Sequence, residues 1–232
     1  MTYIELQAAL GEKIKLSEGQ ISQLTKYAAL LKEWNEKMNL TSIVEEPEVI
    51  EKHFYDCLIP AKVLSFSGKT VVDFGTGAGF PGLVWAICFP ESKVTLIEAT
   101  GKKCTFLQEV INQNKLINVR IYNQRAEEFK QREYYDVVAA RAVAPLPILL
   151  EVAAPLAKVG GVFIAMKSAK GAEELKASSG AMKSLHLVLS DTQSDSLLSG
   201  DGVRLNYFFT KKAPTEKKYP RKWADIEKKP LA

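Results

Sequence analysis

Short apolar runs alternate with longer amphipathic stretches between about residue 70 and residue 167. The short runs are rich in Val, Ile and Phe, which is typical of buried strands, and the longer stretches repeat their apolar residues at helical spacing. The expected strands are 71–74, 94–98, 119–123, 136–140 and 162–167, and the expected helices are 81–89, 102–116 and 145–157. This alternation predicts βαβ units in an α/β fold with a doubly wound, mostly parallel sheet.

Two apolar runs near the end of the chain differ from this pattern because no helical stretch separates them. Residues 185–191 and 204–212 are joined by a loop rich in Asp, Ser and Gly. We expect them to pair antiparallel at one edge of the sheet.

Helical patterns precede the first strand. Ser17 and Gln20 form a capping box that opens an expected helix over residues 17–38. A second pattern begins near Pro47, and Pro60 is expected to bend or end it. We therefore expect three parts: an N-terminal helical extension (residues 1–68), the α/β domain (69–212) and a basic C-terminal tail (213–232).

Composition narrows the classes of protein. The apolar share of 47% and the charged share of 25% are those of a globular protein with a sizeable core. The N-terminus lacks the apolar segment of a secretory signal, and prolines and Glu151 interrupt the most apolar later stretch, residues 142–157. We expect a cytoplasmic protein without a membrane span.

Cysteine and histidine usage argues against a metal site or a disulfide framework. Cys57, Cys88 and Cys104 are far apart, and the two histidines are His53 and His186. Each cysteine is expected to be a small buried apolar residue. His53 lies on an apolar helical stripe, so we expect a hydrogen-bonded core histidine rather than a catalyst.

The glycine-rich stretch VVDFGTGAGFPG (71–82) follows the first expected strand and fits two ligand-binding patterns. GxGxxG is the dinucleotide fingerprint, whereas DxGxGxG resembles the first motif of S-adenosylmethionine (SAM) methyltransferases. Pro81 has no N–H to offer a pyrophosphate, and Asp73 would place a carboxylate near it. An ammonium group, such as that of SAM, favours a nearby carboxylate instead. We therefore favour SAM over NAD. A Walker loop is excluded because no Gly-Lys-Ser/Thr follows the glycine loop.

Glu98 ends the second expected strand, 16 residues after Gly82. A carboxylate at this place can accept hydrogen bonds from both ribose hydroxyls of a nucleoside. The alternative is an exposed acid at a strand end.

The chain resembles the RsmG (GidB) family of bacterial 16S rRNA guanine-N7 methyltransferases over nearly its whole length. The resemblance depends on the order and spacing of several segments rather than on any one of them. They are WNEKMNLTSI (34–43), HFYDCL (53–58), DFGTGAGFPG (73–82), IEATGKKCTFL (97–107), RAEEF (125–129), YDVVAARAVAPL (135–146), AMKSAKG (165–171) and KYPRKWADIEKKPL (218–231). Where the family usually reads SRA this chain reads Ala140-Arg141-Ala142, and WADIE replaces a glycine-containing turn.

The resemblance implies a Rossmann-like SAM-dependent methyltransferase fold and a set of cofactor-binding residues. These are Asp73, Gly75, Gly77, Gly79, Phe80, Glu98, Ala99, Thr100, Ala126, Glu127 and Arg141. Three have structural alternatives. Phe80 is either a cofactor contact or core, Glu127 is either beside adenine or an acid at a helix start, and Arg141 is either at the site or paired with Asp73 or Asp136.

The family implies 16S rRNA or the small ribosomal subunit as partner, and charge agrees with an RNA partner. Residues 203–232 hold nine Lys and Arg against three Asp and Glu, although a solvated tail would look the same. We expect a monomer. The expected RNA contacts are Lys102, Lys103, Arg125, Lys167, Lys170, Lys217, Lys218, Arg221 and Lys222.

Guanine N7 has a lone pair and no proton, so transfer of the SAM methyl group to it needs alignment but no general base. Three other functions remain open: a SAM methyltransferase acting on another RNA site, a small molecule or a protein; an NAD-dependent oxidoreductase; and an RNA-binding module without activity.

Overall fold

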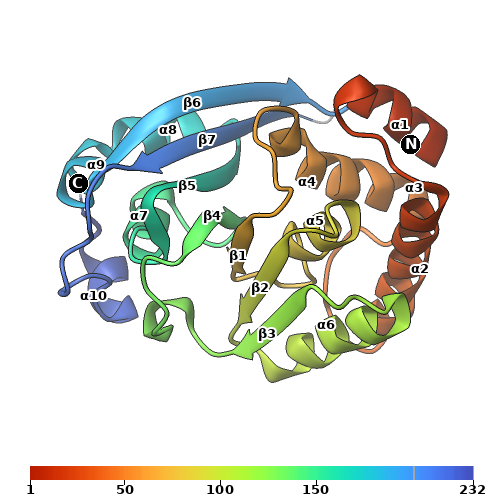
Figure 1. The fold of residues 1–232 in the computed structure, drawn as a ribbon, viewed down its shortest axis with the longest axis horizontal. Coiled ribbons are helices and arrows are strands. Elements are labelled where there is room, and N and C mark those ends of the chain that lie inside the picture. Colours follow the sequence, from red (N-terminus) through yellow and green to blue (C-terminus); the bar gives the residue numbers. More distant parts are fainter. Residues whose placement is uncertain (201, 232) are drawn as a thin grey trace.

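The computed structural model describes residues 1–200 and 202–231, and it contains a seven-stranded sheet (Figure 1). The strand order is β3-β2-β1-β4-β5-β7-β6, and β7 runs opposite to the other strands of this sheet. The strands are β1 (Thr70–Phe74), β2 (Lys93–Glu98), β3 (Val119–Asn123), β4 (Tyr135–Arg141), β5 (Ala157–Ser168), β6 (Leu187–Ser196) and β7 (Val203–Lys211). The doubly wound sheet and its antiparallel edge are thus confirmed.

The order of the strands reverses between β1 and β4, which are parallel neighbours although two strands separate them in sequence. Phe74 at the end of β1 pairs with Ile97 in β2, so these two strands end at the same edge. In open α/β sheets this reversal leaves a crevice beyond the carboxyl ends of the strands, where ligands bind.

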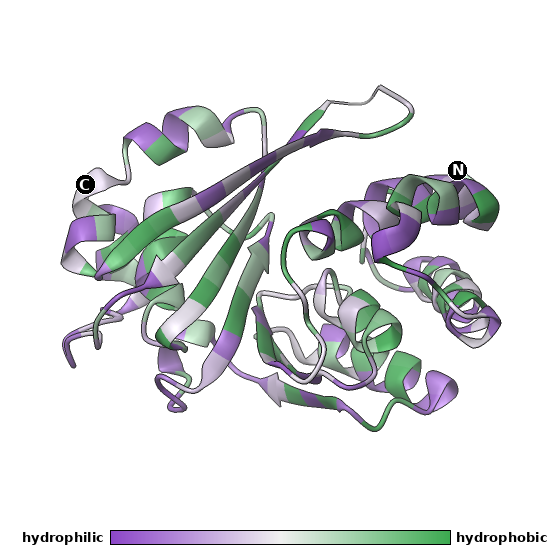
Figure 2. Cartoon of the chain, turned by 45° about the horizontal axis from the view of Figure 1, so that its top comes forward, coloured by the Kyte–Doolittle hydropathy of each residue, from purple (hydrophilic) through white to green (hydrophobic). Residues whose placement is uncertain are grey.

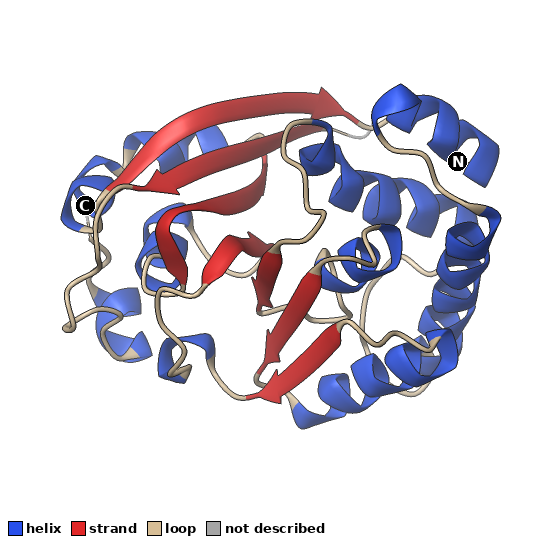
Figure 3. Ribbon diagram, in the orientation of Figure 1, coloured by secondary structure: helices blue, strands red, loops and turns tan. Residues whose placement is uncertain are grey.

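Helices cover both faces of the sheet (Figure 3). The N-terminal helices, α5 and α6 lie on one face and share one apolar core with it, so no separate core divides residues 1–68 from the sheet. This face carries α1 (Tyr3–Leu10), α2 (Glu18–Asn35), α3 (Glu46–Val49), α4 (Asp56–Leu58), α5 (Gly82–Cys88) and α6 (Gly101–Asn114). The capping box expected at the start of α2 is present, with Gln20 N 3.2 Å from Ser17 Oγ.

The other face is covered by helices from the second half of the chain, which enclose a second apolar core. They are α7 (Leu146–Ala153), α8 (Gly171–Lys176), α9 (Ser179–Ser184) and α10 (Trp223–Lys228). Figure 2 shows the central strands as mainly hydrophobic along the part that lies between these layers. No helix within the described ranges is long and apolar enough to cross a membrane.

A π-helical segment interrupts the helix that begins near Pro47. Residues Ile50–Tyr55 form this segment between α3 and α4, and a 3-10 turn over Ile59–Lys62 follows at Pro60. Such segments are rare and occur frequently at functional sites. Here it carries His53 toward the carboxyl end of β4.

The expected C-terminal tail, apart from residue 232, which lies outside the described residues, packs against the domain. Tyr219 and Ile226 are buried in the second core. Arg221 forms a two-pronged ion pair with Glu151 of α7, whose side chain is fully buried, with Nε 2.8 Å from Oε1 and Nη2 2.6 Å from Oε2. Residues 212–231 therefore form a strap along α7 rather than a free tail.

Candidate active site

The glycine loop after β1 turns back toward β2. Gly75 has φ +64°, and its N–H donates to the Ile97 carbonyl at 2.8 Å. A Cβ built at Gly75 would lie 2.7 Å from Val143 Cγ2 in the loop after β4. Both the backbone angle and this close approach require glycine. The loop therefore brings the ends of β1 and β4 into contact.

Asp73 holds the glycine loop in this shape. Its Oδ2 accepts hydrogen bonds from Thr76 Oγ1 at 2.5 Å and from the Gly82 amide at 2.8 Å. Its Oδ1 is buried and has no hydrogen-bond partner among the described residues. Burial raises the pKa of Asp73 to about 7, although the bonds from Thr76 and Gly82 act to lower it. The side chain is therefore an acceptor built into the loop, with one oxygen unsatisfied.

Glu98 joins the glycine loop to the loop after β2. Its Oε2 accepts from the Gly77 amide at 2.9 Å, and its Oε1 accepts from the Thr100 amide at 2.8 Å. Each carboxylate oxygen has a second lone pair for another donor. The buried carboxylate is thus oriented rigidly while it can still accept from a diol.

A cavity of about 180 Å³ opens at the carboxyl ends of β1, β2 and β3. Expected cofactor residues that line it are Gly75, Glu98, Ala99, Ala126 and Glu127. Residues that the sequence analysis did not single out complete the wall, namely Phe74, Ile97, Gln124, Val143, Val152 and Trp223, together with Arg125. A glycine turn, an oriented carboxylate and apolar walls fit the methionine, ribose and adenine parts of SAM.

Phe80 lies away from this cavity. Its ring is buried and stacks on Tyr27, with centroids 5.3 Å apart, and on His53, at 4.3 Å. Gly79 beside it packs so tightly that a Cβ would lie 2.7 Å from the Tyr27 hydroxyl. Of the two interpretations of Phe80, the packing favours core, because the ring faces the N-terminal helices.

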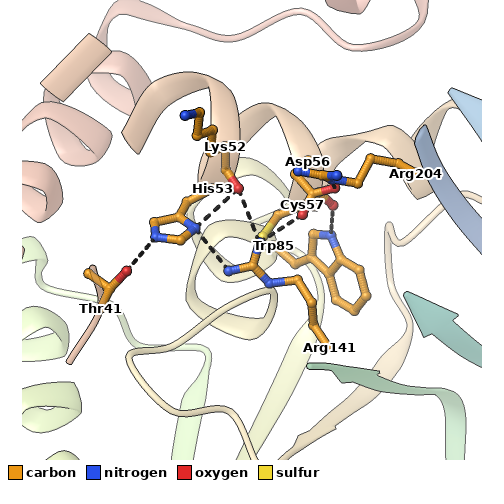
Figure 4. A network of polar contacts seen from close by, with 8 residues as sticks. All are labelled: Thr41, Lys52, His53, Asp56, Cys57, Trp85, Arg141 and Arg204. Atoms are coloured by element: carbon orange, nitrogen blue, oxygen red, sulfur yellow. Dashed lines mark hydrogen bonds and ion pairs between the residues drawn. The ribbon is translucent and has the colours of Figure 1, made fainter. Parts of the chain in front are cut away.

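Arg141 at the end of β4 reaches the π-helical segment (Figure 4). Its Nη1 lies 2.7 Å from Asp56 Oδ2 and 3.2 Å from the Lys52 carbonyl. Its guanidinium carbon lies 5.1 Å from the centroid of Phe80. Arg204 binds the other oxygen of Asp56 at 3.2 Å. The carboxylate partner of Arg141 is therefore Asp56, not Asp73 or Asp136 as considered from the sequence.

His53 is held neutral in this network. Burial, followed by the charge of Arg141, lowers the pKa of His53 to about 3. Arg141 Nη2 lies 3.0 Å from His53 Nδ1, and a guanidinium can only donate, so Nδ1 accepts. The proton therefore lies on Nε2, which donates to Thr41 Oγ1 at 3.0 Å. His53 acts as a hydrogen-bonded core residue, as expected, and is unsuited to proton transfer near pH 7.

A second cavity of about 480 Å³ lies beside this network. Its lining combines four basic side chains with two acidic ones, and these are Lys52, Arg141, Lys167, Arg204, Asp56 and Glu174. Ala142 lines this cavity and Val143 lines the first one, so the loop after β4 separates the two. Ala142 has φ +56°, an uncommon angle for a residue with a side chain.

Comparisons with known proteins agree with this arrangement. The model of the GidB family, described as rRNA small subunit methyltransferase G, matches residues 20–197. The chain belongs to this family. Ribosomal RNA small subunit methyltransferase G of Lysinibacillus sphaericus is 45% identical over 231 residues, which cover 97% of each chain. The protein of the same name from Geobacillus kaustophilus is 41% identical over the full length of both chains.

Solved structures show the same fold at low identity. TYW2 of M. jannaschii, solved in complex with AdoMet, has a TM-score of 0.53 at 19% identity and covers 86% of this chain and 79% of its own. PH1948 of Pyrococcus horikoshii, a putative RNA methyltransferase by its description, has a TM-score of 0.55 at 17% identity and covers 81% and 100%. The SAM-dependent methyltransferase fold and the cofactor expected from the sequence are confirmed, and with SAM bound the site supplies an electrophilic methyl group.

Lys167 holds the loop after β4, which lies between the two cavities. Its Nζ donates to the Ala144 carbonyl at 2.6 Å and lies 2.7 Å from Glu174 Oε2, which also accepts from the Leu146 amide at 2.6 Å. The Lys167 side chain is only 9% exposed. Lys167 therefore fixes the position of the loop, and it also lines the second cavity. Its expected contact with RNA stays a prediction.

The other basic residues expected to contact RNA differ in exposure. Arg221 is committed to Glu151, as described above, and Lys103 is partly buried. Lys218 lies 2.9 Å from Glu216 at the surface. The exposed members of the set are Lys102, Arg125, Lys170, Lys217, Lys218 and Lys222.

No thiol nucleophile is evident in the site. Cys57 and Cys88 are buried, and burial raises the pKa of both thiols. Cys104 is partly exposed, and its pKa is also raised, first by burial and then by Glu98. The cysteines therefore stay protonated at neutral pH and do not supply the activated thiolate that attack on a pyrimidine carbon needs.

Besides the apolar lining residues named above, Asp56 and Trp223 were not singled out from the sequence. Asp56 falls in the segment HFYDCL, whose order in the resemblance was the available signal. Trp223 falls in the strap, which was expected to be a basic tail, and no local pattern places it beside residues from β1 to β3.

Proposed function

We propose that this protein transfers the methyl group of SAM to N7 of a guanosine in the decoding-region loop of 16S rRNA. The proposal has two parts, the substrate class and the reacting atom. Close relatives named for methylation of small-subunit rRNA support the substrate class. The site geometry supports the reacting atom.

The observation that carries the proposal is the pair of cavities separated by the loop after β4. The first has the features of a nucleoside site, and the second is lined by four basic side chains, including Lys52, Arg141 and Arg204. Basic side chains favour a polyanion and place its phosphates without reading sequence. In this proposal the RNA occupies the second cavity, and the base meets the methyl group at the Ala142–Val143 loop, where the two cavities adjoin.

The groups around the second cavity match a reaction without a general base. His53 is neutral and uses Nδ1 to accept from Arg141. Asp56 is committed to two guanidinium groups. N7 of guanine needs no deprotonation, so the chain's own contribution is to orient the base, exclude water and align the nucleophile with the methyl group. Arg141 and Lys167 are positioning residues in this proposal, because one fixes the helix and the other fixes the loop.

Incubation with methyl-labelled SAM and unmethylated small-subunit rRNA tests the proposal, with the RNA both free and assembled into subunits. After digestion, chromatography identifies the labelled nucleoside. Label in 7-methylguanosine is the expected result. Label in another nucleoside would overturn the N7 assignment, and label only in a small-molecule acceptor would overturn the RNA substrate.

A further inference from the structure

The wall of the cofactor cavity includes one residue from the C-terminal strap. All other lining residues come from positions 74–152, whereas Trp223 lies 71 positions beyond the last of these, Val152. The ring shares the cavity with Ala126 and Glu127, which follow β3. The glycine loop follows β1 instead, and β2 lies between β1 and β3 in the sheet. Trp223 therefore belongs to the part of the cavity that β3 delimits.

The position of Trp223 is built rather than incidental. Arg221, two residues before it, binds Glu151 through both its backbone amide and its guanidinium. Ile226, three residues after it, is fully buried in the core beside α7. Arg132 holds the preceding turn through a 2.6 Å bond to the Tyr219 carbonyl. The backbone is thus fixed on both sides of the indole.

The indole of Trp223 is half-buried and packs against the second core. A hollow of about 450 Å³ also borders this residue, and Glu127, Glu128 and Lys222 are among its lining residues. Trp223, Arg125 and Glu127 line both spaces. Trp223 therefore lies at the boundary between the cofactor cavity and a surface hollow with basic and acidic side chains.

We propose that Trp223 is a cofactor-binding residue whose indole packs against the adenine of SAM and closes that end of the pocket. Aromatic side chains recognise the flat face of a base without reading its identity, and this packing requires no new polar group. In this arrangement Glu98 binds the ribose and Ala126 lines the cavity together with Trp223, so the strap completes a site that β1, β2 and β3 leave open. The strap thereby has a role in cofactor binding besides any contact with RNA.

The affinity of the purified full chain for SAM and for S-adenosylhomocysteine, measured calorimetrically without RNA, tests the proposal. Replacement of an aromatic side chain that stacks on a base by alanine weakens binding by between about 5- and 150-fold. The affinity of W223A for both ligands should therefore fall by a factor in this range. W223F, which keeps an aromatic face, should stay within about fivefold of the unaltered protein. The thermal transition of each ligand-free variant reports whether the fold is intact. Affinity equal to that of the unaltered protein in a folded W223A would overturn the proposal.

Tryptophan fluorescence supplies a second readout that does not depend on W223A folding. The chain has three tryptophans, and Trp85 is fully buried while Trp34 packs on Phe106 at 5.7 Å. Addition of S-adenosylhomocysteine should quench the emission of the unaltered protein, and W223F should lose this quenching. W34F is the matched control and should keep it. Quenching that persists in W223F would contradict the proposal, and neither readout depends on which RNA is methylated.

Discussion

Arg141 Nη1 lies 2.7 Å from Asp56 Oδ2, and this ion pair joins the end of β4 to the start of α4, 85 residues earlier and directly after the π-helical segment. Both side chains are largely buried, at 16% and 8% exposure. Removal of one partner of a buried pair leaves an uncompensated charge, which costs about 3–5 kcal/mol. The ion pair therefore holds the N-terminal helices in position relative to the site at the end of β4.

Asp56→Asn should lower the free energy of unfolding by about 3–5 kcal/mol, because two guanidinium groups lose their shared anion. Urea denaturation measures the effect. Asp191→Asn, at an exposed position of β6, is the matched control and should change stability by less than about 0.5 kcal/mol. Equal stability of the two variants would show that Asp56 is not a structural anchor.

The affinity for SAM should rise as pH increases from about 6 to about 7. The free protein holds a proton on Asp73, whose pKa is raised to about 7, and the ammonium of SAM favours the charged carboxylate. Binding below pH 7 therefore releases a proton, which calorimetry in buffers of different ionisation enthalpy detects. The same raised pKa means that the free protein loses stability as pH rises from about 4 to about 7 and is constant above, since the folded state binds the proton more tightly than the unfolded state.

Asp73→Asn is the control for this linkage. Asn keeps an oxygen for Thr76 and Gly82 but cannot ionise, so the pH dependence should vanish. A wild-type affinity that does not change between pH 5.5 and 7.5 would rule out a role for this carboxylate in cofactor binding.

Gly75→Val should abolish SAM binding. The residue has φ +64°, and its Cβ would meet Val143, so the loop must move away from the cavity that both residues line. Equilibrium binding of SAM measures the loss, and Gly160→Val serves as a control for a positive φ in open space. Retention of affinity by Gly75→Val would show that the cofactor does not approach this turn.

The triple variant Lys217→Ala, Lys218→Ala and Lys222→Ala should weaken RNA binding while SAM affinity is retained. These side chains are exposed. Each ion pair between lysine and phosphate that is lost should reduce the slope of log affinity against log salt concentration by about 0.7 to 0.9. Arg221 must be kept, because its loss would leave Glu151 unpaired and disturb the strap. Filter binding at several salt concentrations gives the slope. An unaltered slope would show that these lysines of the strap do not contact the RNA.

Local pattern was sufficient to predict the sheet, whereas most of the residues expected at the cofactor came from the family resemblance. Strand 119–123 and the capping box at Ser17 and Gln20 follow from the chemistry of adjacent residues, and both are present as expected. The ligand loops follow strand ends, so Glu98 and Ala126 could be placed at one edge from the strand assignments alone. Such features depend on neighbours within a few positions.

Contacts between distant segments could not be predicted in the same way. The ring of Phe80 follows a glycine loop, yet it is buried because Tyr27 and His53, on separate helices, both stack on it. From the sequence, the partner of Arg141 could be any carboxylate that the fold brings near it. Which carboxylate this is depends on which side chains the π-helical segment turns toward Arg141. Charge alone suggested that Lys167 and Arg221 face solvent, whereas each is used within the fold.

The ion pair between Glu151 and Arg221 also bears on how the protein is made. A ribosome adds residues in order from the N-terminus, so the buried carboxylate of α7 is synthesised 70 positions before its guanidinium partner. A product that stops before residue 221 has an acid inside the core without its cation, a cost of about 3–5 kcal/mol. That is a large share of the margin by which a domain resists unfolding, and unfolded chains are substrates for proteases. The pair thus makes survival of the newly synthesised chain conditional on its completion.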